Sequence, residues 1–239
     1  MGSVPDFQPL YKQVYNVLVG RIAEGSWRPS EVLPSEQALA AELGVSQGTV
    51  RKALDALAAE QLVERRQGKG TYVAQHTQER SLFRFFRMAR SQGERVTPES
   101  NTETAKRRKV RPSEAKLLDL DRSAMVVEIN RTRLIDEVPA IAETIIIPLS
   151  LFPDIDKRGE LPNTLYSLYQ LEYGVSVATA EEELNADIVT KADARRLKLP
   201  EGSAVLKINR VAIAVDGRRV ELRKSRCDTR NLVYAVSVK

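Results

Sequence analysis

The sequence predicts an α+β protein with two domains, an N-terminal winged helix-turn-helix domain followed by an α+β domain built on an antiparallel sheet. Three observations lead to this prediction. Two short amphipathic helices are joined by a tight turn at Gly44, a glycine-tipped hairpin follows them directly, and a pattern of helix and hairpin occurs twice between residues 113 and 221. The 239 residues, 42% hydrophobic and 29% charged, are typical of two ordinary globular domains.

The helix-turn-helix is predicted over residues 33–61. Ser35 follows a proline and precedes an apolar repeat, so it suits the N-cap of a first helix, which Gly44 ends. Ser46 suits the cap of a second helix. One apolar stripe recurs along that helix at three- and four-residue spacing: Val50, Ala53, Leu54, Leu57 and Gln61. The second helix turns polar and basic residues outward, as a recognition helix in the DNA major groove does. An ordinary helical hairpin inside a core is the alternative for this stretch alone.

Residues 62–73 predict a wing after the second helix. They form two strands joined by a turn at Gln67 to Gly70, because glycine tolerates a positive φ at the tip and Val, Thr and Tyr flank it. Gly68 and Gly70 lack side chains, so the backbone and Lys69 can approach a phosphate or the minor groove closely.

Several separated motifs in this region resemble the winged helix-turn-helix of the GntR family, over roughly residues 8 to 74. The motifs are Pro9–Val14, Leu33–Glu36, Leu43–Ser46, Thr49–Arg51, Ala53–Leu54 and Arg65–Thr71. With the outward residues of the second helix and the wing, the resemblance predicts an operator in double-stranded DNA. We expect the DNA contacts at Ser35, Gln37, Ser46, Gln47, Gly48, Thr49, Arg51, Lys52, Arg66, Gly68, Lys69 and Gly70.

Two glutamines depart from the family's pattern. Family members often carry arginine where this chain has Gln37 and Gln47. Arginine favours guanine bidentately, whereas glutamine favours adenine. We therefore expect the operator to differ from the usual family half-site at these positions. Ser30 replaces a common glycine and is interpreted as a tolerated turn change.

The distribution of charge matters more than the formal net charge of +5. Residues 1–76 hold 8 Lys+Arg and 8 Asp+Glu, residues 77–112 hold 10 and 4, and the remainder holds 19 and 20, so the segment charges of 0, +6 and −1 give +5. DNA binding is therefore predicted from the placement of basic residues in the winged domain. The basic cluster 106–109 is interpreted as a solvated strand or loop.

The composition argues against several classes of site. No apolar run of 18 residues and no basic segment before an apolar core occurs, so neither a membrane span nor a secretory signal is predicted, and a cytoplasmic location is expected. Cys227 and His76 are the single cysteine and histidine, which leaves no cluster for zinc and no intramolecular disulfide. We predict no cofactor and no metal, and a Cys/His catalytic pair is only arithmetically possible.

The chain outside the helix-turn-helix is predicted as follows. Residues 1–7 are a disordered start, and a first helix, ending near Gly25, carries a stripe that packs under the recognition helix: Leu10, Val14, Val17, Leu18 and Ile22. We place the DNA-binding domain at 1–76 and the second domain at 77–239, with 77–80 as a polar linker that includes the neighbourhood of His76. A helix is predicted over Ser81–Gly93, with core packing by its Phe and Met side chains.

An internal repeat defines the second domain. A short helix at 113–120 and a hairpin through Asp136 and Glu143 recur 79 positions later as a helix at 191–199 and a hairpin through Asp216 and Glu221. Two such hairpins would form one antiparallel sheet with helices covering one face.

Residues 81–237 resemble the UTRA effector-binding domain of HutC-type GntR regulators, whose fold is similar to chorismate lyase. In such domains the ligand, a small acid or a sugar phosphate, lies between the duplicated halves. The resemblance implies a pocket lined by Arg131, Arg133, Glu143, Thr164, Tyr166, Glu221 and Asp228.

Some of these residues suggest anion binding without the family. Arg131 and Arg133 are two apart on one strand and so share a face, where paired guanidinium groups suit a phosphate or carboxylate. The second copy keeps only Arg210 and has Ala212 in place of the second arginine, which points to a ligand role for Arg133. A solvent-facing charged sheet edge is the alternative. The two glutamates can accept from a ligand or merely pair with the arginines. Thr164 and Tyr166 can donate to an anion at a helix N-terminus, and Tyr166 is equally compatible with a plain core role.

Three functions fit these features. The leading one is a transcription regulator, expected to be a repressor, that binds an inverted-repeat operator as a homodimer and responds to an anionic effector. A chorismate-lyase-like enzyme fused to a DNA-binding module is the second, although the sequence shows no nucleophile and base pair, metal cluster or glycine-rich phosphate loop. A ligand-free architectural DNA-binding protein is the third, and it leaves the paired arginines unexplained.

Overall fold

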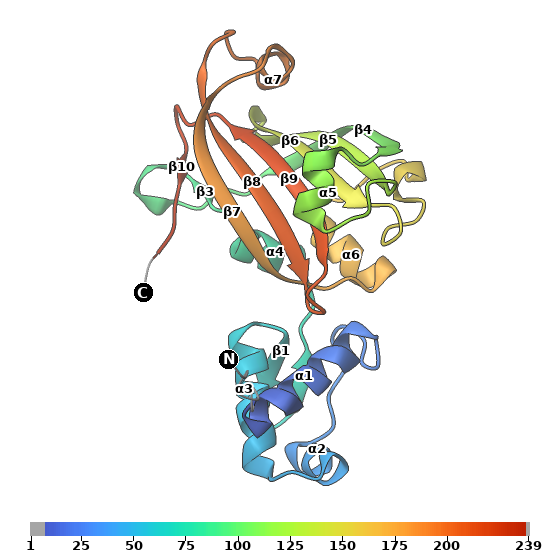
Figure 1. Cartoon of the computed structure of the whole chain (residues 1–239). Helices are drawn as coiled ribbons and strands as arrows, with labels where there is room; N and C mark the ends of the chain where they lie inside the picture. The colour runs from blue at the N-terminus through green and yellow to red at the C-terminus, as the bar shows by residue number, and fades with distance from the viewer. Residues whose placement is uncertain (1–7, 238–239) are drawn as a thin grey trace, which may run out of the picture.

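A computed structural model describes residues 8–237 and confirms the predicted fold class, with the winged domain below a larger sheet domain in Figure 1. The predicted disordered start, residues 1–7, lies outside the described residues. The winged domain consists of α1 (Leu10–Ala23), α2 (Glu36–Leu43), α3 (Gln47–Ala59), β1 (Val63–Arg66) and β2 (Gly70–Val73). None of the helices in residues 8–237 combines the length and apolar character that crossing a membrane requires.

The turn between α2 and α3 is fixed by the predicted caps. The Ser35 hydroxyl accepts from the Ala38 backbone N–H at 3.1 Å, and the Ser46 hydroxyl accepts from that of Thr49 at 3.2 Å. Gly44 ends α2 in the left-handed region with φ 65°, where a β-carbon is unfavourable. The helix-turn-helix geometry therefore follows from local sequence.

The core of the winged domain joins α1 to α3. Val14, Leu18 and Ile22 of α1 are buried against the apolar stripe of α3. Two residues of the predicted α1 stripe, Leu10 and Val17, are instead 51% and 43% exposed, because the buried line follows a strict four-residue spacing. The predicted stripe of α3 was also too long.

Gln61 lies beyond the end of α3, which is at Ala59. It is exposed and adopts a φ of 58°, so it turns the chain toward β1 and contributes nothing to the buried stripe.

The sheet domain is built around one six-stranded antiparallel sheet with the order β4-β5-β6-β9-β8-β7. Its strands are β4 (Glu99–Lys109), β5 (Met125–Ile135), β6 (Val138–Pro148), β7 (Val177–Ile188), β8 (Ala204–Ala214) and β9 (Arg219–Cys227). Its helices are α4 (Gln78–Phe85), α5 (Pro112–Leu118), α6 (Leu165–Tyr173) and α7 (Lys191–Leu197), with short 3-10 turns at Ser91–Gly93 and Ile155–Lys157. A separate ribbon pairs β3 (Met88–Ala89) with β10 (Val233–Tyr234).

The repeat is longer than the sequence indicates. Each copy is a strand, a helix and a hairpin, namely β4-α5-β5-β6 and β7-α7-β8-β9, and the two copies meet where β6 pairs with β9. The edge strands β4 and β7 were not predicted as members of the repeat, because their side chains are mostly polar and exposed and show little apolar alternation.

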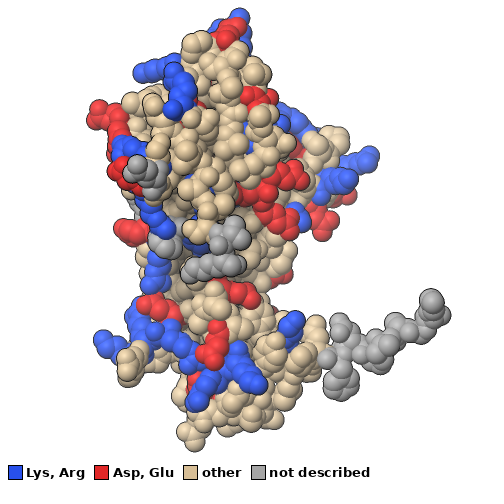
Figure 2. All heavy atoms as spheres, turned by 90° about the vertical axis from the view of Figure 1, so that its left-hand side faces the viewer, with Lys and Arg blue, Asp and Glu red and all other residues tan. Residues whose placement is uncertain are grey.

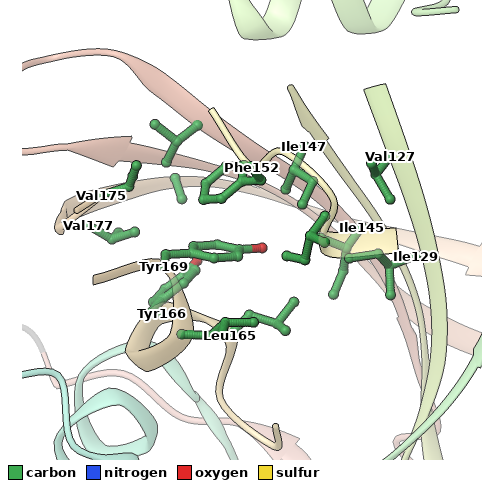
Figure 3. Packing of buried hydrophobic residues seen from close by; sticks show 14 of the residues in the cluster. Val127, Ile129, Ile145, Ile147, Phe152, Leu165, Tyr166, Tyr169, Val175 and Val177 are labelled. Carbon is green, nitrogen blue, oxygen red and sulfur yellow. The ribbon is translucent and has the colours of Figure 1, made fainter. Parts of the chain in front are cut away.

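Helices cover both faces of the sheet, so the prediction of a single covered face is wrong. On one face, Tyr166 and Tyr169 of α6 pack with Phe152 and the sheet residues Ile145 and Ile129, as Figure 3 shows. Neighbouring residues such as Ile146 point to the opposite face, where α5 and α7 cover them. The central strands are apolar on both sides, and both sides must therefore be buried.

The segment between the domains also differs from its prediction. The residues expected to be a linker begin α4, where the Thr77 hydroxyl accepts from the Arg80 backbone N–H. The predicted helix over Ser81–Gly93 is wrong beyond Phe85, because Phe86 is extended and Met88 and Ala89 pair with β10 from the far end of the chain. A helical spacing of Phe and Met cannot reveal this long-range pairing.

The junction between the domains is packed. The Gln170 side chain of α6 accepts from the His76 backbone N–H at 2.8 Å and donates to the Ala74 carbonyl at 3.0 Å, and the Ser167 hydroxyl donates to the His76 carbonyl. Ala178 of β7 belongs to the core of the winged domain. His76 is therefore a half-buried contact between the domains and is not part of a free linker.

Candidate functional sites

The residues predicted to contact DNA lie on one part of the winged domain and face solvent. Gln47, Gly48, Arg51 and Lys52 occupy the exposed start of α3, and Thr49 is partly buried among them. Ser35, Gln37 and Ser46 are exposed around the turn. In Figure 2, Lys and Arg side chains gather over the winged domain with acidic side chains among them. A helix start and its neighbouring turn are thus available to a groove.

Glu36 organises the charged side chains of this surface. Its carboxylate contacts Arg51 and Arg65, each at 2.9 Å, and the Gln47 amide at 3.4 Å. The hydrogen bond from Arg51 lowers the pKa of Glu36, burial opposes this change, and Arg65 adds to the lowering. Sequence reasoning missed Glu36, although it stands in the quoted motif Leu33–Glu36. It is a positioning residue that holds Arg51 by one edge of the guanidinium group.

The wing carries its basic side chains at the tip. Arg66 lies over the Tyr72 ring with 4.3 Å between its guanidinium carbon and the ring centroid, and the Tyr72 hydroxyl donates to the Lys69 carbonyl at 3.2 Å. Gly68 and Gly70 have φ of 70° and 112°. Lys69 is exposed between them. These contacts hold the hairpin while the Lys69 ammonium group stays free for a phosphate.

A cavity of about 50 Å³ lies on the face of the sheet that α4 and α6 cover. Arg133, Glu143, Thr164 and Tyr166, all predicted site residues, line it together. The other walls come from α4, the β3–β10 ribbon and the strands β8 and β9. The structure therefore brings four of the seven predicted residues to one hollow.

Arg131 and Arg133 converge on one carboxylate. The Glu143 carboxylate accepts from Arg131 Nε at 2.6 Å and from Arg133 Nε at 3.3 Å, and both guanidinium groups donate to the Asn163 carbonyl. Arg131 is 0% and Arg133 3% exposed, which excludes the solvent-facing edge considered above. Burial lowers the pKa of Arg133 to about 9, and the charge of Arg131 adds to this effect. Arg131 Nη2 is buried without a hydrogen-bond partner among the described atoms.

Two charged residues of the second copy of the repeat, Glu221 and Arg223, extend this cluster. Glu221 is fully buried, and its carboxylate accepts from Arg223 at 2.9 and 3.0 Å, from the Tyr169 hydroxyl at 2.8 Å and from the Tyr166 hydroxyl at 3.2 Å. Arg223 Nη1 also reaches Glu143 at 3.3 Å. Burial raises the pKa values of both glutamates, but the charges of the neighbouring arginines outweigh it and keep both below their usual value. Both carboxylates are therefore ionised at neutral pH.

Three predicted residues do not line the cavity. Arg131 and Glu221 lie behind it, in the layer that holds Arg133, Glu143 and Tyr166. Asp228 accepts from its neighbour Arg230 at 2.8 Å in a local turn and is absent from the cavity wall.

Sequence reasoning missed several residues of the cavity. The side chains of Arg210, Arg223, Ser225 and Ser81 line it. Arg210 pairs with Glu182 at 2.6 Å and donates to the Phe85 carbonyl, and the Tyr234 hydroxyl donates to Glu182. The only signal for Arg210 is its equivalence to Arg131 in the repeat. Within residues 8–237, no group of three or more His, Cys, Asp or Glu side chains is arranged to hold a metal ion.

Comparisons with known proteins match both domains. Residues 10–73 match the model described as bacterial regulatory proteins, gntR family, and residues 93–231 match the UTRA domain. The chain is 28% identical over 220 residues to the HTH-type transcriptional repressor NagR of Bacillus subtilis, covering 91% of this chain and 89% of that protein. It is also 28% identical over 226 residues to the mannosyl-D-glycerate transport/metabolism system repressor MngR of Escherichia coli, covering 93% and 92%.

The fold is also similar to a solved structure. The crystal structure of PhnF from Mycobacterium smegmatis matches with a TM-score of 0.57 and 21% identity, over 95% of this chain and 99% of that one. The similarity extends across both domains, so the order of the winged domain and the sheet domain is shared.

Proposed function

Because the chain belongs to the gntR family of bacterial regulatory proteins and carries a UTRA domain, we propose that it represses transcription as a homodimer whose operator binding is altered by a small anion in the sheet-domain cavity. The family makes it a DNA-binding transcription regulator with an effector-binding domain. Repression is proposed from the similar proteins NagR and MngR, both named as repressors.

An excess of buried arginine at the cavity carries the proposal of an anion. Four arginines and three glutamates lie buried or nearly so on this face of the sheet, which leaves one positive charge in excess. They are Arg131, Arg133, Arg210 and Arg223 with Glu143, Glu182 and Glu221. An uncompensated buried charge is costly, and a bound phosphate or carboxylate would compensate it. In the layer behind the cavity, Arg131 Nη2 is also buried without a hydrogen-bond partner among the described atoms, so the protein's own acceptors do not satisfy this group.

The size of the cavity implies movement on binding. Ligand pockets usually measure roughly 300–1,000 Å³, whereas this cavity measures about 50 Å³. A metabolite must therefore displace a wall. The sheet wall is fixed by continuous strand pairing, so the wall formed by α4 and the β3–β10 ribbon is the one we expect to move.

Helix α4 touches the winged domain as well as the cavity. Leu82 and Phe85 line the cavity, whereas Arg80 contacts Glu64 of the wing at 2.7 Å and Arg84 donates to the Glu60 carbonyl at 2.9 Å. Figure 1 shows α4 between the sheet and the winged domain. A ligand that shifts α4 therefore changes contacts that position the wing, which gives the two sites a physical route for coupling.

The operator is proposed to be an inverted repeat. One protomer offers one recognition helix, and a two-fold dimer places two of them in successive major grooves at a fixed half-site spacing. Light scattering should give twice the chain mass, and footprinting should protect two symmetric half-sites. Full-affinity binding of a monomer to one half-site would contradict this.

The effector is best found by a thermal-shift screen against metabolite acids, followed by operator binding with and without each hit. A ligand at 100 times its dissociation constant adds about 2.7 kcal/mol of stability. We expect a phosphate or carboxylate that stabilises the protein and weakens its hold on the operator. Chemical turnover of the hit would instead favour the lyase-like enzyme, and the absence of any effect on DNA would favour the architectural role.

A further inference from the structure

Ser81 of α4 has a polar group with nothing to bind. Its side chain is 5% exposed and lines the cavity, and its hydroxyl oxygen is buried without a hydrogen-bond partner among the described atoms. A buried hydroxyl normally finds a partner, because leaving it unpaired costs the desolvation of that group. Ser167 of α6, which does not line the cavity, shows the normal case, since its hydroxyl contacts both the Thr164 hydroxyl at 3.2 Å and the His76 carbonyl.

Ser81 faces the cavity from the side of α4, while the arginine cluster faces it from the sheet. Arg133 and Arg223 project from β5 and β9, and Glu143, which they share, projects from β6. A ligand between these walls has its acid group at the arginines and reaches Ser81 with another atom. Ser81 can donate to a carbonyl or hydroxyl oxygen and can accept from a hydroxyl or amide.

We propose that Ser81 is an effector-binding residue, and that the effector therefore carries, besides its acid group, an uncharged hydrogen-bonding group such as a hydroxyl, carbonyl or amide. This inference rests on the proposed function and narrows its ligand class to hydroxy, keto or amido acids. It also identifies the contact through which the ligand holds α4. Leu82 and Phe85, the other cavity-lining residues of α4 next to Ser81, offer apolar side chains.

The first test needs no effector. Ser81→Ala removes an unpaired hydroxyl, so the melting temperature of the full-length protein should stay unchanged or rise by a few degrees. The matched control Ser167→Ala removes a hydroxyl with two partners and should lower the melting temperature. An equal loss in both variants would show that Ser81 is bonded within the fold, and the proposal would be overturned.

The second test uses two acids small enough for the present cavity, acetate and glycolate, which differ by one hydroxyl group. At equal ionic strength, glycolate should stabilise the wild type at roughly two- to ten-fold lower concentration than acetate, the factor for one neutral hydrogen bond. Ser81→Ala should respond equally to both. A glycolate preference that persists in Ser81→Ala would overturn the assignment.

If the proposed function fails, the same measurements give a different result from a failure of the Ser81 assignment. Wild type and Arg133→Ala responding identically to acetate would remove the anion site itself. In that case the melting temperatures of the two serine variants still decide whether the Ser81 hydroxyl is free for a ligand.

Discussion

The surface of the winged domain that is predicted to contact DNA and the cavity of the sheet domain both pair arginine with glutamate, and the two pairs differ in burial. Arg51 touches Glu36 at 2.9 Å with 58% of its side chain exposed, whereas Arg131 touches Glu143 at 2.6 Å with 0% exposed. Water and salt weaken the first contact more than the second, because the second is buried. The same pair of residue types therefore orients a side chain in one domain and holds the fold in the other.

Because of this difference in burial, substitutions at the two sites should affect folding stability to different degrees. In the winged domain, the predicted DNA contacts can be changed with little effect on folding, because their neighbours remain solvated. In the sheet domain, the buried arginines outnumber the buried glutamates by one, so removing a glutamate leaves a further arginine uncompensated. Variants of matched chemistry in the two domains test whether burial is the cause.

The largest effect is expected for Glu221→Gln. The substitution leaves Arg223 buried beside a neutral amide, and breaking a buried pair typically costs about 3–5 kcal/mol. Denaturant unfolding followed by circular dichroism measures the loss. The control in the winged domain is Glu36→Gln, whose partners Arg51 and Arg65 are 58% and 37% exposed. It should leave the free energy of unfolding nearly unchanged and weaken operator binding, because the two arginines lose their common partner. Fluorescence of Trp27, the single tryptophan, follows unfolding of the winged domain separately from the circular dichroism of the whole chain. Equal losses of stability would show that burial does not distinguish the two sites.

Acidification should act first at the junction between the domains. Burial lowers the pKa of His76 from 6.5 to about 4, with the charge of Arg84 adding to this. The unfolded chain therefore binds a proton that the folded one does not between those values, so stability is complete above pH 6.5 and falls as the pH drops toward 4. A shift of this size corresponds to at most about 3–4 kcal/mol of folding free energy. In His76→Gln, the melting temperature should change less between pH 6.5 and pH 4 than it does in the wild type.

A second loss of stability is expected at lower pH, where the buried glutamates become protonated. Glu143 and Glu221 have pKa values held below their usual 4.5, so their contribution is present above about pH 4.5 and is lost as the pH falls further. His76→Gln should leave this second loss of stability in place. A single transition that disappears entirely in the variant would contradict the separation.

Arg133→Ala should weaken effector binding with little effect on the free protein. A charge-assisted hydrogen bond contributes on the order of 1.5–3 kcal/mol, so titration calorimetry should show roughly ten- to a hundred-fold weaker binding. Burial and the neighbouring Arg131 both disfavour a charge at Arg133, and its removal takes away the excess positive charge, so the apo protein should remain folded. Arg133→Lys should restore little, because an ammonium group lacks the planar fork. Operator affinity without effector should stay the same, and unchanged effector affinity would remove the anion pocket.

The sequence was sufficient for features that depend on neighbours along the chain. The caps Ser35 and Ser46 and the left-handed Gly44 act within a few residues, so the helix-turn-helix was predicted nearly residue by residue. The shared face of Arg131 and Arg133 follows from the alternation of a strand and was also right. The end of the helix after Phe85 was missed, because its cause is the pairing of Met88 with Tyr234.

The cavity depends on contacts between the two repeats, which no local pattern contains. Arg223 pairs across the sheet with Ile145, and Glu143 with Ser225, so the second copy contributes an arginine where the first copy has an isoleucine. Aligning the two repeats shows which residues are equivalent, but not which residues lie next to each other in the sheet. For the same reason Glu221 was predicted as a ligand contact, although α6 covers it with Tyr166 and Tyr169.

The smallest effects on folding, and the most specific effects on DNA, are expected for Arg51 and Lys69. Arg51 lies exposed at the start of α3 with one guanidinium edge held by Glu36, which suits a base contact. Arg51→Ala should relax the preference at one operator position by roughly ten- to a hundred-fold.

Lys69→Ala tests the other kind of DNA contact. Lys69 sits between two glycines at the exposed tip of the wing, where an ammonium group meets a phosphate as a point charge. Its removal should weaken binding to every DNA sequence about equally. It should also reduce the slope of log affinity against log salt concentration by about 1. Both variants should keep the wild-type melting temperature, because neither side chain is buried. Competition assays on a set of operator variants at several salt concentrations distinguish the two. Equal, sequence-independent losses for both would show that Arg51 contacts the backbone only, and the operator would then be read elsewhere, with Gln47 and Gln37 as the next residues to change.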